Sequence, residues 1–347
     1  MKVYFDRKLI IKEYVSFLSP ILWIPDFDIR WEDKEQIRNR SFVWNKYIIK
    51  SSMEDCDYFI YPKYFSLELY NELKEYVKLA SAYWKKTIVF DYWEIDDYID
   101  ISNDILWFKR STKKTNPENE YCLPPFPKDI YNEVNSVWVE ENSTEISIWF
   151  CGYSKTLNIK YFLSNILHLI TSLKVIKKIL MKLGNTWLYN ILVNAWIWNY
   201  YRWKTISQLK QMKIYKFNFI ERKHALTKAE SEKYRKEYLK NMSKSIFPLS
   251  IRGFWNYSVR HYEILSTWKI PLYIDTWAKL PFESKINYKD LFIIVPFFDI
   301  KNIENYINEY IKKNHNILQN KNEKIRYIYK NYFTMTAYYK KIIEILL

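Results

Sequence analysis

The chain has 347 residues, of which 49% are hydrophobic and 27% charged. This composition excludes a disordered chain, a collagen and a simple repeat array, and the length suits two domains of about 150 residues each. We therefore expect a packed globular protein with two domains.

Positive charge is concentrated in the second half of the chain. Residues 1–150 carry 20 Lys and Arg against 26 Asp and Glu, a net charge of −6, whereas residues 151–347 carry 34 against 13, a net charge of +21. The second half is therefore expected to bind an anion. Nucleic acid, an acidic membrane surface and a phosphorylated small molecule all meet this requirement, so charge alone does not choose among them.

Cysteine and histidine spacing indicates neither a disulfide framework nor a zinc site, because the three cysteines form no CxxC pair and the four histidines no HxxxH. The first 14 residues carry charges throughout and lack the apolar core of a signal peptide. The most apolar stretch, residues 187–203, is interrupted by three asparagines. We interpret it as a buried helix, with a membrane-interface helix as the alternative. We expect a cytoplasmic protein, with peripheral contact to a membrane surface as a further option.

Short apolar runs typical of buried strands occur in both halves and alternate with helical patterns. In the first half they are MKVYF (1–5), DYFIYP (57–62), KTIVFD (86–91) and DILWFK (104–109). In the second half they are ISIWFCG (146–152), KIYKFNF (213–219), SIFPLSI (245–251), KIPLYID (269–275) and LFIIVPF (291–297). Helical patterns cover residues 160–183, 227–245 and 323–347.

Strands that alternate with helices predict parallel sheets, so we expect an α/β protein with two Rossmann-like domains. The first domain is expected over residues 1–145 and the second over 146–318. A C-terminal helix over 319–347 is expected to follow and to pack back on the first domain. In such folds ligands bind beyond the carboxyl ends of the strands, where the candidate site residues are sought.

Glycine is scarce, with three in the whole chain. A GxGxxG dinucleotide loop and a Walker phosphate loop are both excluded, which argues against dehydrogenases and P-loop ATPases. Gly152 ends one predicted strand, and Gly253 follows the end of another. At both places the absence of a side chain lets a ligand approach the backbone closely. Two tight turns are the alternative interpretation.

A candidate anion site follows the strand at residues 245–251. Arg252 and Gly253 form a turn, a helix is expected to begin near residues 256–258, and Arg260 and Glu263 share one face of that helix. A phosphate at the first helical turn would meet free backbone N–H groups and the two arginines. Glu263 could then accept hydrogen bonds from the sugar hydroxyls of a nucleoside. An ordinary surface ion pair between Arg260 and Glu263 is the alternative.

This segment resembles the signature block of the exostosin-like glycosyltransferases of family 47. The matching patterns are R-G-x(4)-S-x-R-x-x-E at residues 252–263, I-P-L-x-I-D at 270–275 and L-P-F-x(3)-I-N-Y at 280–288. FIERKHAL (219–226) and ISIWFCG (146–152) are similar to flanking segments of the shorter bacterial and viral-type members. The similarity is specific over residues 213–300, weaker over 146–212 and generic before that.

The resemblance implies a glycosyltransferase-B fold, in which two Rossmann-like domains face a cleft and the second domain holds a nucleotide sugar. It also implies an inverting transfer, in a single displacement, to a glycan acceptor bound by the first domain, with UDP as the preferred nucleotide. The donor-binding residues that it implies are Gly152, Arg222, Arg252, Gly253, Ser258, Arg260, Glu263 and Asp275. Because the arginines and the helix N-terminus would supply the positive charge, we expect turnover without a metal ion and without a cofactor.

An inverting transfer needs a general base for the acceptor hydroxyl. Asp91 closes the KTIVFD strand at its carboxyl end and Glu94 follows it, so both are candidates, although acidic residues after a strand are also common helix caps. Arg110 follows the DILWFK strand and is a candidate for an acidic group of the acceptor or for an internal ion pair. His261 neighbours Arg260 on the predicted helix but points elsewhere, and we interpret it as packing.

Two other functions remain open from the sequence. The first is single-stranded nucleic-acid binding, suggested by the basic second half together with 15 Trp and 32 Tyr residues that could stack on bases. The aromatic residues run through both halves in strand and helix positions, which fits a core and a cleft better, so we expect no nucleic-acid partner. The second is a non-catalytic, glycan-binding relative that keeps the fold.

Overall fold

The computed structural model describes residues 1–10, 48–65, 69–91, 101–136, 146–153, 195–212, 215–222, 231–253, 256–314 and 318–347. The chain divides into two compact units. The first unit comprises Met1–Lys128, Trp277–Ile286 and Tyr327–Leu347, and the second comprises Asp129–Thr276 and Asn287–Arg326. This division differs from the expected boundaries at residues 145 and 318, because α3 (Tyr131–Ser136) belongs to the second unit and Trp277–Ile286 to the first.

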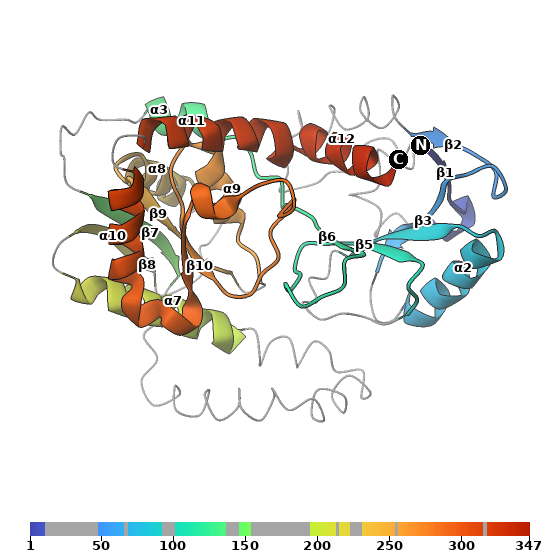
Figure 1. The fold of residues 1–347 in the computed structure, drawn as a ribbon, viewed down its shortest axis with the longest axis horizontal. Helices are drawn as coiled ribbons and strands as arrows, with labels where there is room; N and C mark the ends of the chain where they lie inside the picture. Colours follow the sequence, from blue (N-terminus) through green and yellow to red (C-terminus); the bar gives the residue numbers. More distant parts are fainter. Residues whose placement is uncertain are drawn as a thin grey trace. The chain divides into compact units, whose positions relative to one another are not determined.

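The first unit is built on a six-stranded sheet in the order β2-β1-β3-β4-β5-β6, in which all paired strands run parallel (Figure 1). Its strands are β1 (Lys2–Tyr4), β2 (Ile49–Lys50), β3 (Tyr58–Tyr64), β4 (Lys86–Asp91), β5 (Ile105–Lys109) and β6 (Glu120–Cys122). Its helical elements are η1 (Arg7–Leu9), α2 (Tyr70–Ala82), η8 (Tyr329–Phe333) and α12 (Met335–Leu346).

Both faces of this sheet are covered by helices, because neighbouring residues of a strand point to opposite sides. Ile88 and Phe108 belong to one apolar cluster with residues of α12. Val89 and Trp107, their immediate neighbours, belong to a second cluster with residues of α2. Near-continuous apolar runs such as KTIVFD are typical of parallel strands that are buried on both faces.

The second unit contains a five-stranded parallel sheet in the order β11-β10-β9-β7-β8 (Figure 1). Its strands are β7 (Ser147–Tyr153), β8 (Lys216–Arg222), β9 (Phe247–Ser250), β10 (Leu272–Asp275) and β11 (Ile293–Pro296). Its helical elements are α3 (Tyr131–Ser136), α7 (Ala195–Gln211), α8 (Ser231–Ser243), α9 (Val259–Ser266), η5 (Tyr288–Asp290), η6 (Phe297–Asn302), α10 (Ile303–Asn314) and most of α11 (Leu318–Ile328), whose last two residues belong to the first unit.

The central strand β7 again separates two apolar environments. Trp149 and Cys151 pack in one cluster with residues of α3, α8 and α9. Phe150 points to the other side, where the guanidinium of Arg202 in α7 lies 5.9 Å from its ring centroid. A side chain of α7 thus reaches the carboxyl end of β7.

The prediction of an α/β protein with parallel sheets is confirmed, and each of the nine predicted strands corresponds to a strand of the structure. The strands β2 and β6 were not predicted because they are two and three residues long and lack an apolar run. The expected C-terminal helix is divided into α11, the π-helical turn η8 and α12. The predicted helix over residues 160–183 lies outside the described residues.

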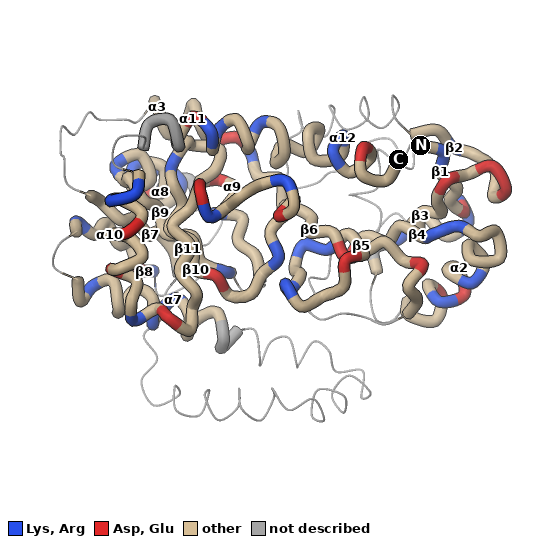
Figure 2. The backbone as a smooth tube through the Cα atoms, in the orientation of Figure 1, with Lys and Arg blue, Asp and Glu red and all other residues tan. Residues whose placement is uncertain are grey.

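Lys, Arg, Asp and Glu positions occur along the backbone of both units (Figure 2). Some of these charges are buried. Lys109 Nζ lies 3.2 Å from Glu120 Oε1, and the two side chains are 1% and 0% exposed. Asn116 donates a hydrogen bond of 2.7 Å to Glu120 Oε2, so both carboxylate oxygens are engaged. This ion pair joins β5 to β6 inside the first unit.

We predict that Glu120→Ala lowers the free energy of unfolding by about 3–5 kcal/mol, because it removes the carboxylate that compensates a buried ammonium group. Urea unfolding followed by tryptophan fluorescence measures the change. The matched control is Glu75→Ala, which breaks an exposed pair with Lys78 whose side chains are 69% and 61% exposed and should cost less than about 1 kcal/mol. Equal losses in the two variants would contradict this account of the pair.

Candidate functional site

The carboxyl edge of the second sheet has a topological switch between β7 and β9. The chain runs from β7 to β8 on one side, then returns to place β9, β10 and β11 on the other. At such a point the connections leave the sheet in opposite directions, which opens a crevice where ligands of α/β proteins bind. Gly152 lies near the end of β7, and Arg252 and Gly253 follow β9, so three predicted site residues gather at this switch.

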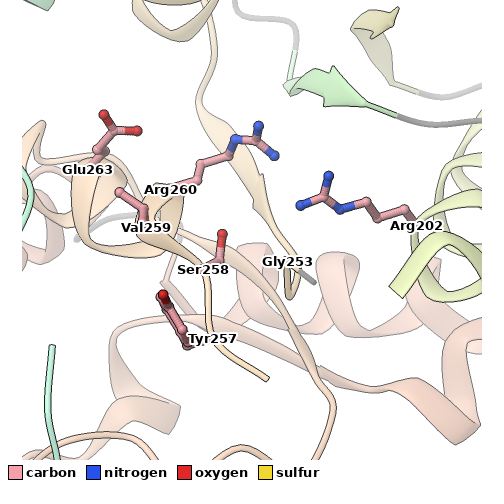
Figure 3. Close-up of a pocket in the computed structure, with 7 residues that line it drawn as sticks. All are labelled: Arg202, Gly253, Tyr257, Ser258, Val259, Arg260 and Glu263. Carbon is pink, nitrogen blue, oxygen red and sulfur yellow. The ribbon is translucent and has the colours of Figure 1, made fainter. Parts of the chain in front are cut away.

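A cavity of about 320 Å³ lies beside this switch (Figure 3). Its walls come from α7, from the turn after β9 and from the first turns of α9. The lining residues are Arg202, Gly253, Tyr257, Ser258, Val259, Arg260 and Glu263. The sequence analysis had selected Gly253, Ser258, Arg260 and Glu263 as donor-binding residues, and the structure brings these four to one cavity.

Arg260 lies across the end of β7. Its Nη2 donates to the carbonyl oxygen of Cys151, and its guanidinium carbon lies 4.9 Å from the Phe150 ring centroid. Its Nε and Nη1 are buried and have no hydrogen-bond partner among the described residues. A buried donor without a partner costs free energy, and more so when it carries charge, so an anion in the cavity would satisfy Arg260.

Gly152 makes this position of Arg260 possible. A Cβ atom added to Gly152 would lie 2.7 Å from Arg260 Nη2, which is too close for the two groups to coexist. The glycine was predicted to allow close approach of a ligand, but in the structure the group that approaches it is an arginine of the site.

Arg202 is a site residue that the sequence analysis missed. It projects from α7, donates from Nε to the Arg252 carbonyl oxygen at 3.1 Å, and lies 4.5 Å from the Trp198 ring centroid. Figure 3 shows its guanidinium turned toward that of Arg260 across the cavity. No sequence motif surrounds Arg202, since it sits in an apolar, aromatic-rich helix. Only its position as a charge within the most apolar stretch of the chain set it apart.

The electrostatics of the cavity favour an anion. The pKa of Arg202 lies well below its ordinary value, first because burial removes water from the guanidinium and then because Arg260 and Arg252 repel its charge. Arg252 is also buried, and its guanidinium carbon lies 6.0 Å from the Tyr201 ring centroid. An anion bound between the guanidinium groups would reverse the repulsion that lowers the pKa of Arg202.

The start of α9 adds donors to the same wall. Ser258 is the N-cap of α9 and its side chain makes no capping hydrogen bond. The turn before it is closed by a hydrogen bond of 2.8 Å from the Gly253 N–H to the Tyr257 carbonyl oxygen. The first N–H groups of a helix have no partner within the helix and carry partial positive charge, so this end of α9 complements the arginines.

Glu263 does not form the ion pair with Arg260 that the sequence left open. Its Oε1 accepts a hydrogen bond of 2.8 Å from Arg235 Nη1, and its Oε2 accepts one of 2.5 Å from the Tyr238 hydroxyl. Both partners come from α8. The guanidinium of Arg260 is thus not neutralised by the carboxylate one turn away on its own helix.

Four predicted donor-binding residues are not among those that line this cavity, namely Gly152, Arg222, Arg252 and Asp275. Gly152 lies against Arg260, and the Arg252 carbonyl oxygen accepts from Arg202. Arg222 ends β8, forms an ion pair with Glu237 at 3.1 Å and lies 4.2 Å from the Tyr234 ring centroid. Asp275 ends β10, on the far side of β9 from β7, and is half-buried. His261 packs as predicted, since it is buried beside Ser250 Oγ at 3.0 Å, and burial lowers its pKa to about 3, which leaves the ring neutral.

The candidate catalytic and acceptor-binding residues of the first unit lie at the carboxyl ends of neighbouring strands. Asp91 is the last residue of β4 and is fully buried, while Arg110 directly follows β5 and is buried as well. Asp91 pairs with Lys109 in the register of β4 and β5, so the ends of these two strands are adjacent. Glu94 lies outside the described residues.

The sequence contains two D-x-D triplets, a spacing that can hold a divalent metal ion, at residues 26–28 and 55–57. The first triplet lies outside the described residues. In the second, Asp55 accepts from the Ser52 hydroxyl and Asp57 accepts from the Lys2 N–H. Across the described ranges, no three His, Cys, Asp or Glu side chains gather closely enough to hold a metal ion.

Comparison of the chain with models of known protein families gave no match. Comparison with curated proteins gave none either. Among the helices that the structure describes, none combines the length and the apolar character needed to cross a membrane.

We predict that Gly152→Ala weakens anion binding at this cavity, because the added methyl group displaces Arg260 from the end of β7. Calorimetric titration with inorganic pyrophosphate should show at least a tenfold loss of affinity, the loss expected when one charge-assisted hydrogen bond is removed.

A double-mutant cycle with Arg260→Ala provides the control. If the clash with Arg260 is the cause, Gly152→Ala should have no further effect on pyrophosphate affinity or on thermal stability in the Arg260→Ala background. Additive effects of the two substitutions would show that Gly152 acts independently of Arg260, contrary to this interpretation.

Proposed function

We propose that the protein is an inverting glycosyltransferase that moves a sugar from a UDP-linked donor to a glycan acceptor. The observation that carries this proposal is that the guanidinium groups of the buried Arg202 and the half-buried Arg260 face each other in a cavity at the switch of a parallel sheet. An anion with two phosphate groups matches such a pair in charge and in its number of acceptor oxygens.

The sequence resemblance supports the same function. Four residues of the R-G-x(4)-S-x-R-x-x-E pattern, namely Gly253, Ser258, Arg260 and Glu263, line the cavity together. The resemblance also implies the glycosyltransferase-B arrangement, which we include in the proposal. Each unit has the parallel sheet with helices on both faces that this arrangement requires of its domains.

In the proposed reaction the acceptor hydroxyl attacks the anomeric carbon of the donor sugar as the bond from that carbon to the diphosphate oxygen breaks. The electron pair of the broken bond leaves with the diphosphate, whose developing charge Arg202, Arg260 and the N-terminus of α9 would stabilise. Since protein cations supply this charge, we propose a turnover that needs no metal ion. The proton of the acceptor hydroxyl passes to a carboxylate, for which Asp91 is our candidate among the described residues.

We predict that UDP raises the thermal stability of the protein and that Arg202→Ala and Arg260→Ala each weaken UDP binding by about tenfold to a hundredfold. UDP at 100 times its dissociation constant should stabilise the wild-type protein by about 2.7 kcal/mol. Thermal unfolding over a series of concentrations of UDP, GDP and CMP measures the effect and identifies the preferred nucleotide.

Lys204→Ala is the matched control for Arg202→Ala. Lys204 lies on the same helix and carries the same charge, but its ammonium contacts the Tyr200 and Phe297 rings at 5.6 and 5.5 Å rather than lining the cavity. It should leave UDP binding unchanged. A protein that no nucleotide stabilises, and that instead binds single-stranded oligonucleotides with strong salt dependence, would contradict the proposed function.

A further inference from the structure

The Phe150 ring contacts both arginines that face each other in the cavity. Phe150 lies on β7, an inner strand of the second sheet, and is 0% exposed. Its ring centroid lies 4.9 Å from the guanidinium carbon of Arg260 and 5.9 Å from that of Arg202. An aromatic ring attracts a cation over distances up to about 6 Å, so both contacts are favourable. One side chain thus supports two charges that reach it from different helices.

Each arginine also has anchors of its own. Arg202, on α7, donates to a backbone carbonyl oxygen at 3.1 Å and lies 4.5 Å from the Trp198 ring centroid. Arg260, on α9, donates to the Cys151 carbonyl oxygen and lies 5.7 Å from the Trp149 ring centroid. These anchors fix each side chain separately, whereas the shared ring on β7 connects the two.

The two guanidinium groups do not hold each other in place. A guanidinium carries only hydrogen-bond donors, so two of them cannot pair directly. Burial lowers the pKa of Arg202, and the charges of Arg260 and Arg252 lower it further, which is the effect of repulsion. The spacing of Arg202 and Arg260 is therefore set by the protein around them, and a ring that contacts both is suited to set it.

The tip of the Phe150 ring is confined at the carboxyl end of β7. A Cβ atom added to Gly152 would lie 3.3 Å from Phe150 Cζ and 2.7 Å from Arg260 Nη2. The same glycine thus leaves room for the ring and for one of the guanidinium groups. A ring packed this closely in a buried place keeps one position, and the cations that it attracts are held with it.

A fixed spacing of two cations distinguishes ligands by their number of phosphate groups. A single phosphate can be held by one guanidinium, whereas a diphosphate engages both and gains most when both are already in place. We propose that Phe150 is a positioning residue that fixes the spacing of Arg202 and Arg260, so that the cavity selects diphosphates over monophosphates. This inference rests on the proposed function, because the diphosphate is part of the donor proposed above.

Calorimetric titration with inorganic phosphate and inorganic pyrophosphate tests this role. The wild-type protein should bind pyrophosphate at least about tenfold more tightly than phosphate, since a second guanidinium is engaged. Phe150→Leu keeps an apolar side chain but removes the ring. Its affinity for pyrophosphate should fall about tenfold, while its affinity for phosphate stays within about twofold of wild type. Phe150→Met should give the same pattern and replaces the leucine variant if that variant does not fold.

A double-mutant cycle separates positioning from a general effect on the fold. In the Arg202→Ala background no pair remains to be spaced, so Phe150→Leu should change pyrophosphate affinity by less than about twofold. Phe247→Leu is the matched control, because Phe247 is also 0% exposed, lies on the neighbouring strand β9 and packs edge-on against the Tyr310 ring. It should leave both affinities unchanged.

The inference is wrong if the wild-type protein binds phosphate and pyrophosphate equally, or if Phe150→Leu leaves pyrophosphate affinity unchanged. A parallel loss of both anions in Phe150→Leu, or additive effects of Phe150→Leu and Arg202→Ala, would also overturn it. These results leave the proposed function standing as long as the wild-type protein binds UDP. Binding of pyrophosphate without binding of UDP would instead contradict the proposed function and leave the role of Phe150 intact, and failure to bind either would refute both.

Discussion

The functional account of the second unit depends on the buried Arg202 and the half-buried Arg260, whose guanidinium groups face each other across one cavity (Figure 3). Arg202 is held by a backbone carbonyl and an indole ring, and Arg260 by a carbonyl and the Phe150 ring. Burial lowers the pKa of Arg202, and repulsion from Arg260 and Arg252 lowers it further. The carboxylate nearest to Arg260 in the sequence, that of Glu263, accepts hydrogen bonds from Arg235 and Tyr238 of α8. An anion in the cavity would offset the repulsion between these guanidinium groups.

Much of the fold could be predicted from the sequence because parallel strands buried on both faces are continuous apolar runs. KTIVFD and ISIWFCG are such runs, and they became β4 and β7. Short edge strands give no such signal, so β2 and β6 were missed. Backbone positions with positive φ also escaped prediction, because in this glycine-poor chain Trp84, Phe126, Trp268, Trp277 and Phe282 adopt them where glycine is usual.

The candidate site was predictable where its residues are close in the sequence. Gly253, Ser258, Arg260 and Glu263 fall within one strand–turn–helix segment, so their closeness in the sequence, together with the resemblance, placed them at one site. Arg202, Arg235 and Tyr238 reach the site from α7 and α8, and only the packing of these helices on the sheet brings them there. Arg222 was implied by the resemblance alone. In the structure it ends the edge strand β8, forms an ion pair with Glu237 and is not among the residues that line the cavity.

A crystal structure of the protein with UDP bound tests the central claim most directly. The account predicts diphosphate density in the cavity, with phosphate oxygens within about 3 Å of guanidinium nitrogens of both Arg202 and Arg260. The ribose should lie at the end where Glu263 is held by Arg235 and Tyr238. Diphosphate density elsewhere on the protein, or an empty cavity at saturating UDP, would contradict the account.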